Sequence, residues 1–94
     1  RKESSAASDV YKRQEKNRQP LIDAATELVE LSLHDKGCVA YDVFGSLTVD
    51  NHLMICETWK NRADLEAHMA TEHFRRIVPR LQALATMTTE EFTF

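Results

Sequence analysis

ETWKNRADLEAHMATEHF, residues 57–74, is the stretch that decides the fold of this chain. Its first three residues are typical of a strand that ends on Trp59, and the asparagine and aspartate that follow suit a helix cap and an acidic first turn. His68 is expected on that helix. Thr71 caps a second helix, with His73 in its first turn. The stretch therefore predicts two imidazoles and an indole near one end of a small sheet.

The neighbouring residues are typical of a β-hairpin. Residues 38–47 and 52–60 are rich in β-branched and aromatic side chains, and the polar residues 45–51 join them. A hairpin centred on this loop pairs Cys38 with Trp59. One sheet face then carries Cys38, Ala40, Asp42, Phe44, Leu53, Ile55, Glu57 and Trp59, and the other carries Val39, Tyr41, Val43, Met54, Cys56 and Thr58. Because both faces are largely apolar, helices are expected to cover one face and a second subunit the other.

Helical periodicity flanks the hairpin on both sides. Residues 18–35 carry apolar side chains at helical spacing and end at Gly37, which supplies a left-handed stop. The helix that Thr71 opens keeps an apolar stripe along its length, and Pro79 is expected to bend or break it. Residues 88–94 alternate as a last short strand. The order helix, strand, strand, helix, strand predicts an α+β domain of the ferredoxin-like βαββαβ type without its first strand.

The first fourteen residues look foreign to this domain. Ser4 to Gln14 can be back-translated into a transposase-based sequencing adapter, including its mosaic end. Residues 1–14 are therefore expected to be an adapter-derived leader, and residues 15–94 the domain without its native first strand. That strand is central in the βαββαβ topology. Without the leader, which has four basic and two acidic residues, the net charge changes from −3 to −5.

Composition argues against several classes of function. A chain of 94 residues forms one domain, and its negative charge and pI near 5.8 argue against nucleic-acid binding. No apolar run reaches the roughly 20 residues that span a bilayer. Cys38 and Cys56 are expected as reduced thiols, which indicates a cytoplasmic protein. The sequence shows no glycine-rich nucleotide loop and no nucleophile turn.

Four segments, in order and at matching distances, resemble the antibiotic biosynthesis monooxygenase (ABM) domain, a family that includes quinol monooxygenases. Residues 37–44 are similar to its second strand and residues 57–59 to its third. Residues 65–68 and 71–74 are similar to its pair of helices, with Glu72 where proline is common. The resemblance implies a homodimer that forms a shared α/β barrel. It also implies catalysis without metal, flavin or another cofactor.

In ABM proteins of the monooxygenase type, a phenol or quinol occupies an apolar cavity and reduces dioxygen once it is deprotonated. The resemblance implies that Trp59 stacks on this substrate, that His68 is the general base and that His73 accepts a proton or orients the ring. The alternatives are a core tryptophan, a buried histidine bonded to a carbonyl and a capping histidine. The other expected substrate-binding residues are Phe74, Asp42, Glu57 and Phe44.

Asp42 and Glu57 are acidic groups on a predicted sheet face that is otherwise apolar. Burial there would raise their pKa values and make either one a proton acceptor, whereas an ion pair with Arg75 or Arg76 is the alternative. No metal site is expected, because the two candidate histidines are five residues apart and lack the i, i+4 spacing of a helical zinc pair.

The function that these features favour is a cofactor-independent monooxygenase or oxidase of a quinol or polyphenol. Its expected partners are a small aromatic substrate, dioxygen and a second copy of the chain. The first alternative is an isomerase or lyase of a small carbonyl compound on the same fold, which would not depend on oxygen. The second is a non-enzymatic dimeric module for an aromatic metabolite, which would show saturable binding without turnover.

Overall fold

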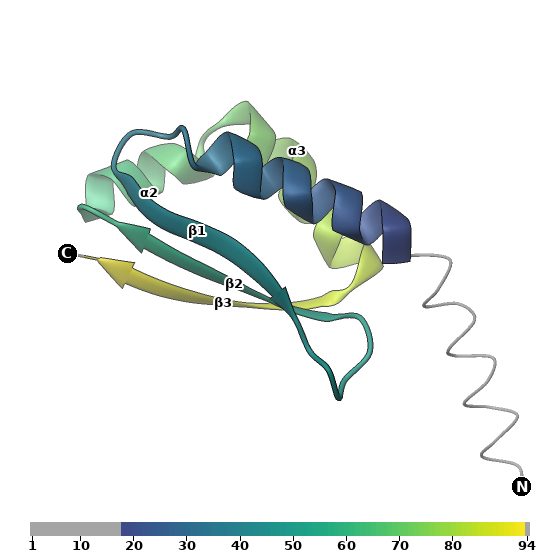
Figure 1. Cartoon of the computed structure of the whole chain (residues 1–94). Coiled ribbons are helices and arrows are strands. Elements are labelled where there is room, and N and C mark those ends of the chain that lie inside the picture. The colour runs from purple at the N-terminus through teal and green to yellow at the C-terminus, as the bar shows by residue number, and fades with distance from the viewer. Residues whose placement is uncertain (1–17, 94) are drawn as a thin grey trace, which may run out of the picture.

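The computed structural model of the chain describes residues 18–93, apart from the side chains of residues 90–93. The elements are a first helix of residues 18–32, β1 (Cys38–Gly45), β2 (His52–Trp59), α2 (Arg62–Met69), α3 (Glu72–Leu84) and β3 (Thr86–Thr93). The helices form one layer over one face of the sheet (Figure 1). This architecture is the α+β class that the sequence predicts. The predicted leader, residues 1–14, lies outside the described residues.

The sheet has the strand order β1-β2-β3. β1 and β2 form the predicted antiparallel hairpin, whereas β2 and β3 are parallel neighbours connected through α2 and α3. In a ferredoxin-like unit, the split βαβ arrangement leaves room for a strand between two such parallel strands. Here β3 pairs directly with β2, from His52↔Thr86 to Trp59↔Thr93. The predicted first strand, which would precede residue 18, was expected to lie between β2 and β3. In the described sheet these two strands are direct neighbours, so no gap is left between them.

The register of the β1–β2 hairpin differs from the prediction by one residue. Cys38 lies opposite Trp59 as predicted, but a β-bulge follows it, and the ladder then pairs Tyr41 with Glu57. One extra residue in a strand moves every later side chain to the other face of the sheet. The predicted assignment of the β1 side chains beyond Cys38 to the two faces is therefore wrong.

The bulge decides which β1 side chains reach the helices. Tyr41 is 4% exposed and Val43 packs against the core, so both face the helix layer. Asp42 and Phe44 were predicted to share a face with Glu57, but both are exposed. They alternate with the two core-facing residues along the strand and so lie on the opposite face of the sheet.

The core lies between the helix layer and the sheet. Its buried apolar side chains come from the first helix, α2, α3 and the two hairpin strands: Leu21, Ala24, Ala25, Leu28, Tyr41, Ile55, Trp59, Leu65, Ile77 and Leu81. Burial of one large apolar side chain contributes about 1.5–3 kcal/mol to folding. The apolar stripes predicted for the first helix and for α3 supply many of these core residues, so helical periodicity predicted which sides of these two helices are buried.

α3 runs without interruption from Glu72 to Leu84 and includes Pro79. Of the two predicted effects of this proline, the break is wrong, and the bend stays a prediction. Pro79 is exposed, so water can reach the backbone carbonyl that its missing N–H leaves without a partner. Within residues 18–93, no helix has the length and apolar character needed to cross a membrane.

No described segment covers the sheet face opposite the helices, which we call the bare sheet face (Figure 1). Phe44 on β1 is 50% exposed and Val39, at the bulge, is 52% exposed. The hairpin loop adds Leu47 and Val49, which are also exposed. An apolar surface of this kind is a common mark of an interaction site.

Candidate functional site

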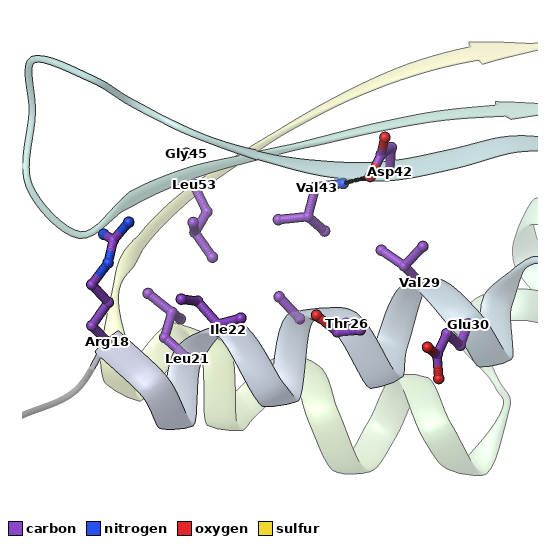
Figure 2. Close-up of a pocket in the computed structure, with 11 residues that line it drawn as sticks. Arg18, Leu21, Ile22, Thr26, Val29, Glu30, Asp42, Val43, Gly45 and Leu53 are labelled. Atoms are coloured by element: carbon purple, nitrogen blue, oxygen red, sulfur yellow. Dashed lines mark hydrogen bonds between the residues drawn. The ribbon is translucent and has the colours of Figure 1, made fainter.

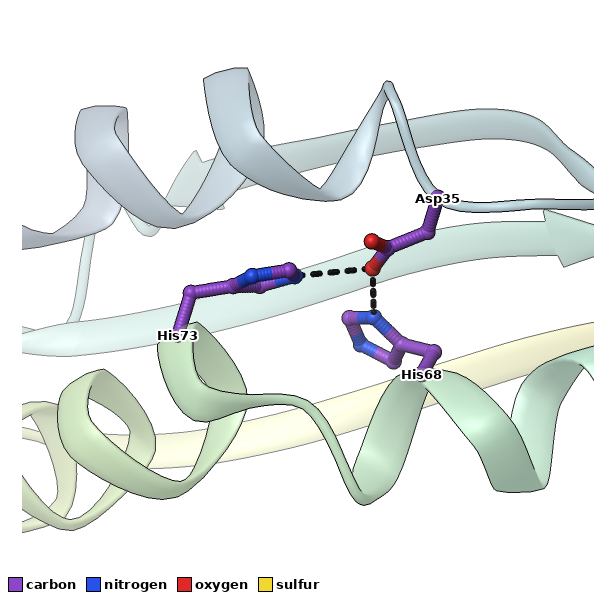
Figure 3. A group of neighbouring side chains, drawn as sticks. All are labelled: Asp35, His68 and His73. Atoms are coloured by element: carbon purple, nitrogen blue, oxygen red, sulfur yellow. Dashed lines mark hydrogen bonds and ion pairs between the residues drawn. The ribbon is translucent and has the colours of Figure 1, made fainter.

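Asp35, His68 and His73 form a cluster at one end of the helix layer (Figure 3). The Oδ2 atom of Asp35 lies 2.7 Å from Nδ1 of His68 and 2.8 Å from Nε2 of His73. The His68 side chain is fully buried, whereas the side chains of Asp35 and His73 are 16% and 15% exposed. The cluster therefore links a buried imidazole to one that reaches the surface.

The turn that ends the first helix places Asp35. Its backbone N–H donates to the carbonyl of Ser32 over 3.0 Å, and its own carbonyl accepts from the N–H of Cys38 over 3.1 Å. Gly37 adopts φ +78°, and a Cβ atom at this position would collide with the carboxylate of Asp64. Only glycine fits this turn without strain.

Two helix caps place the histidines, as the sequence predicts. The side chain of Asn61 accepts from the N–H of Asp64 at the start of α2. Thr71 accepts from the N–H of Phe74 at the start of α3 and donates its hydroxyl to the carbonyl of His68 over 2.6 Å. This last bond fixes the angle between the two helices, so that the two imidazoles converge on one carboxylate.

Aromatic rings enclose the imidazole of His68. Its centroid lies 4.7 Å from that of Trp59, 5.2 Å from that of Phe74 and 5.3 Å from that of Tyr41. The Tyr41 and Phe74 rings meet it edge-on. Trp59 is fully buried, and its Nε1–H donates to Oε1 of Glu57 over 2.7 Å. The indole therefore joins the buried carboxyl group to the histidine cluster.

A small cavity of about 160 Å³ lies between the sheet and α3 beside this cluster. Its walls are Tyr41, Ile55, Glu57, Met69, Phe74, Val78, Gln82, Met87 and Thr89. A dry apolar cavity of roughly 150 Å³ is large enough for benzene. Tyr41 and Glu57 bring a phenol and a carboxyl group to a wall that is otherwise mostly apolar. His68 is not among the lining residues, but its imidazole contacts the rings of Tyr41 and Phe74, which are.

A wider groove of about 410 Å³ lies between the first helix and the hairpin (Figure 2). Val43 and Leu53 point into it toward the helix, whereas the side chain of Asp42 points away. Most of its lining is aliphatic, and its charged lining residues Arg18, Glu30 and Asp42 are exposed. Since the buried ionisable groups lie around the smaller cavity, we place the candidate site there.

Burial controls the charge of two groups near the cavity. It raises the pKa of the Tyr41 phenol, with a further rise from the charge of Glu57, while the Ser32 hydroxyl acts in the opposite direction. Burial also raises the pKa of the Cys38 thiol, and the charges of Asp35 and Glu57 add to this. At neutral pH Tyr41 is thus a hydrogen-bond donor, and Cys38 is a thiol rather than a nucleophilic thiolate.

The structure brings most of the predicted site residues together and separates two of them. His68, His73, Trp59, Glu57 and Phe74 gather around the cavity and the cluster. Asp42 and Phe44 lie on the other sheet face because of the bulge. Arg76, considered as a partner for the acidic groups, pairs with Glu27 and Glu72 instead.

Sequence reasoning missed Asp35 and Tyr41. Asp35 is a polar residue in a predicted helix end, and nothing in the local pattern aims it at residues more than thirty positions away. The signal that was present is chemical, since a buried imidazole needs a hydrogen-bond partner. Tyr41 was assigned to the wrong face with the rest of its strand.

The three polar side chains of the cluster also raise the question of a metal. Their nearest ligand atoms lie within 4.8 Å of one another, a convergence that the five-residue spacing of the histidines did not suggest. The two oxygen–nitrogen distances, 2.7 and 2.8 Å, are those of charge-assisted hydrogen bonds. Donor atoms around one zinc ion are about 3.3 Å apart for bonds near 2.0 Å. The observed distances between Asp35 and the two histidines are shorter than this, and they fit hydrogen bonds better than common coordination of a metal ion.

The sequence profile described as "Antibiotic biosynthesis monooxygenase" matches residues 10–80 of the chain. The chain belongs to this family. The ABM resemblance of the sequence is thereby confirmed. Family membership supports a monooxygenase-like function at a coarse level, and it leaves the substrate open.

Two curated relatives are each 31% identical to the chain over 61 residues, or 65% of its length. One is the uncharacterized protein sll1783 of Synechocystis, of which 42% is covered. The other is YcnE of Bacillus subtilis, named as a candidate monooxygenase, of which 64% is covered. The chain thus spans less than two-thirds of the length of either relative.

Two crystal structures share the fold. A protein of unknown function from Bacteroides thetaiotaomicron, described as a possible oxidoreductase, is 47% identical, with a TM-score of 0.66 and 76% of each chain covered. An antibiotic biosynthesis monooxygenase is 39% identical, with a TM-score of 0.62 and coverage of 69% of this chain and 68% of its own. These similarities confirm the predicted fold class.

Proposed function

We propose that the chain is a cofactor-independent monooxygenase, or oxidase, that acts on a small quinol or polyphenol. The observation that carries this proposal is the ring-sized cavity whose wall holds a buried carboxyl and a phenol, with a fully buried imidazole directly behind. Family membership supports the same reaction class. The two free thiols support a cytoplasmic location.

The cavity provides what such a reaction requires of a protein. Phe74 and Met69 offer apolar contacts for a ring, and Glu57 brings a buried carboxyl group to the same wall. Removal of a proton makes the substrate electron-rich, so that it reduces dioxygen itself. A quinol and dioxygen then give a hydroxyquinone and water, with one oxygen atom in each product. Exclusion of bulk water protects the reactive intermediates.

His68 is the proposed proton acceptor, and Glu57 on the cavity wall is the second candidate. The rings of Tyr41 and Phe74 are in edge contact with the His68 imidazole, and both residues also line the cavity. A modest rotation of Phe74, which is only partly buried, would open the way to a bound substrate. Catalytic hydrogen bonds often form fully only when the substrate is present.

A homodimer is the proposed assembly. The bare sheet face carries Val39 and Phe44, each about half exposed, and a second copy packed on it would remove this apolar surface from water. A shared barrel of two sheets would also close the open side of the hairpin. Asp42 and Phe44 would then lie in the interface, not beside the cavity.

Oxygen uptake with a panel of quinols, without added metal or flavin, tests the proposed function. Boiled protein is the control for autoxidation. Uptake above this control that persists in the presence of a chelator is the expected result. A folded protein that consumes no oxygen with any member of the panel would contradict the proposal and favour the isomerase or the binding module.

A further inference from the structure

One carboxylate oxygen of Asp35 serves two imidazoles (Figure 3). We propose that Asp35 is a positioning residue that keeps the proton of His68 on Nδ1, and that the shared oxygen couples proton uptake at His68 to proton release at His73. The cluster would thus connect the buried imidazole of His68 to solvent. The base role of His68 belongs to the proposed function, and in this respect the inference rests on it.

The chemistry of the three groups fixes where the hydrogens lie. An ionised carboxylate only accepts hydrogen bonds, so each nitrogen that faces it carries a hydrogen. His68 is therefore protonated on Nδ1, and its basic nitrogen in the neutral ring is Nε2. By the same argument His73 carries a hydrogen on Nε2, and Nδ1 is its second site for a proton. A carboxylate orients the histidine base of serine proteases in the same way.

The three side chains of the cluster differ in their exposure to solvent, and this difference sets the direction in which a proton can leave. The side chain of His68 is 0% exposed, so a proton that it receives has no direct route to water. The side chain of His73 is 15% exposed and that of Asp35 is 16% exposed. His73 therefore exchanges protons with solvent, and Asp35 lies between it and the buried ring.

Charge couples the two rings. Their centroids are 6.0 Å apart, with one negative charge between them. That charge stabilises one imidazolium, and a second positive charge at this distance is disfavoured. When His68 takes a substrate proton on Nε2, the added positive charge favours the loss of a proton from Nδ1 of His73 to water. One proton enters the cluster and another leaves it.

Other ionisable groups lie near His68 on the elements packed against it. On β1, Tyr41 touches the imidazole and Cys38 lies nearby, and burial raises the pKa of both, so both stay neutral. On β2, Glu57 lies opposite Tyr41 in the ladder. On α2 itself, Asp64 lies over the turn at Gly37. Among the described side chains around His68, Tyr41 and Cys38 therefore add no change of charge near neutral pH.

Nitrogen-15 NMR of histidine-labelled full-length chain tests the inference without any substrate. The shifts of the ring nitrogens show which one carries the hydrogen, and a pH titration gives the midpoint for each ring. We expect a hydrogen on Nδ1 of His68 and on Nε2 of His73 at neutral pH. His34, which is exposed, and His52 give internal reference signals in the same spectra.

Two variants separate coupling from a merely structural role. His73→Gln removes the competing positive charge, so the titration midpoint of His68 should rise by about one pH unit. Asp35→Asn replaces the shared carboxylate by an amide, so His68 should lose its preference for Nδ1–H. His34→Gln, next in sequence to Asp35 and exposed, is the matched control and should change neither midpoint.

Three results would overturn the proposal. They are a wild-type His68 with its hydrogen on Nε2, a His68 midpoint that His73→Gln leaves unchanged, and a stoichiometric metal ion on the cluster in the purified protein. If Asp35→Asn fails to fold, the wild-type spectrum and His73→Gln still decide. Because no turnover is measured, a failed oxygen-uptake assay and a failed relay are distinguishable.

Discussion

Trp59 donates its indole N–H to Oε1 of Glu57 over 2.7 Å, between two side chains on the same face of β2. Both residues are buried, Trp59 fully and Glu57 to 4% exposure. Glu57 lines the cavity, whereas Trp59 is not among its lining residues. The structure thus gives the indole a positioning role: it holds the carboxyl group at the cavity wall and packs against His68.

Replacement of Trp59 by phenylalanine should destabilise the fold by about 1–3 kcal/mol, because the buried carboxyl group loses this donor. The measurement is the free energy of unfolding in urea. Glu57→Gln is the matched variant, since its amide oxygen can still accept from the indole, and it should cost less. Equal stability of Trp59→Phe and wild type would show that the bond contributes nothing.

Stability should fall at alkaline pH because of Tyr41. Burial raises the pKa of this phenol above its ordinary value of 10.0, so the folded chain keeps a proton that the unfolded chain releases. This contribution is complete below about pH 10 and is lost as the pH rises further, with a slope of at most about 1.4 kcal/mol per pH unit. Urea unfolding of wild type and Tyr41→Phe at pH 8 and pH 11 measures it. The wild type should lose more stability than the variant, and parallel losses would refute the assignment.

The helices and their caps were predictable because their signals are local. Asn61 and Thr71 cap α2 and α3 where the sequence places them, and the apolar stripe of the first helix forms its buried side. Gly37 ends the first helix region with a positive φ, as expected. These features depend on residues within one or two turns of each other, so the sequence alone contains the required information.

Gly37→Ala should be strongly destabilising. An alanine at φ +78° costs about 1–2 kcal/mol, and its Cβ would also collide with the carboxylate of Asp64. Gly45 is the matched control, because it lies at a strand end and a Cβ there meets nothing closer than 4.0 Å. Gly45→Ala should therefore change stability by no more than about 0.5 kcal/mol. Similar urea midpoints for the two variants would contradict this account of the turn.

Two features could not be predicted from the sequence: the bulge after Cys38 and the contact of Asp35 with the two histidines. A bulge shifts the ladder by one residue without a local sequence signal here, and it exchanged the faces of Tyr41 and Asp42. Asp35 meets His68 only because the helix layer brings distant segments together. Both features are products of tertiary packing, which hydrophobic periodicity does not encode.

Two substitutions by glutamine distinguish the candidate bases. If His68 is the base, His68→Gln should lower oxygen uptake 10²- to 10⁴-fold, the usual contribution of general acid–base catalysis. Glu57→Gln should then have a smaller effect. The reverse order would transfer the role to Glu57, which already lines the cavity. His34→Gln, an exposed imidazole outside the cluster, should retain wild-type activity.

The proposed dimer predicts different effects for two side chains of equal exposure. Phe44 on the bare sheet face is 50% exposed, and Leu33, after the first helix, is 49% exposed. Phe44→Glu places a charge in the proposed interface and should weaken dimerisation at least tenfold, which corresponds to about 1.4 kcal/mol. Leu33→Glu should leave the dimer intact, because it lies on the helix side of the molecule.

Size-exclusion chromatography with light scattering over a range of concentrations measures both variants. A monomeric wild type would refute the dimer, and dissociation by Leu33→Glu alone would move the interface to the helix layer. The distinction also bears on the site. The cavity is bounded on the helix side by α3, so a dimer through the sheet leaves its walls in place, whereas a dimer through the helices would cover the surface at His73.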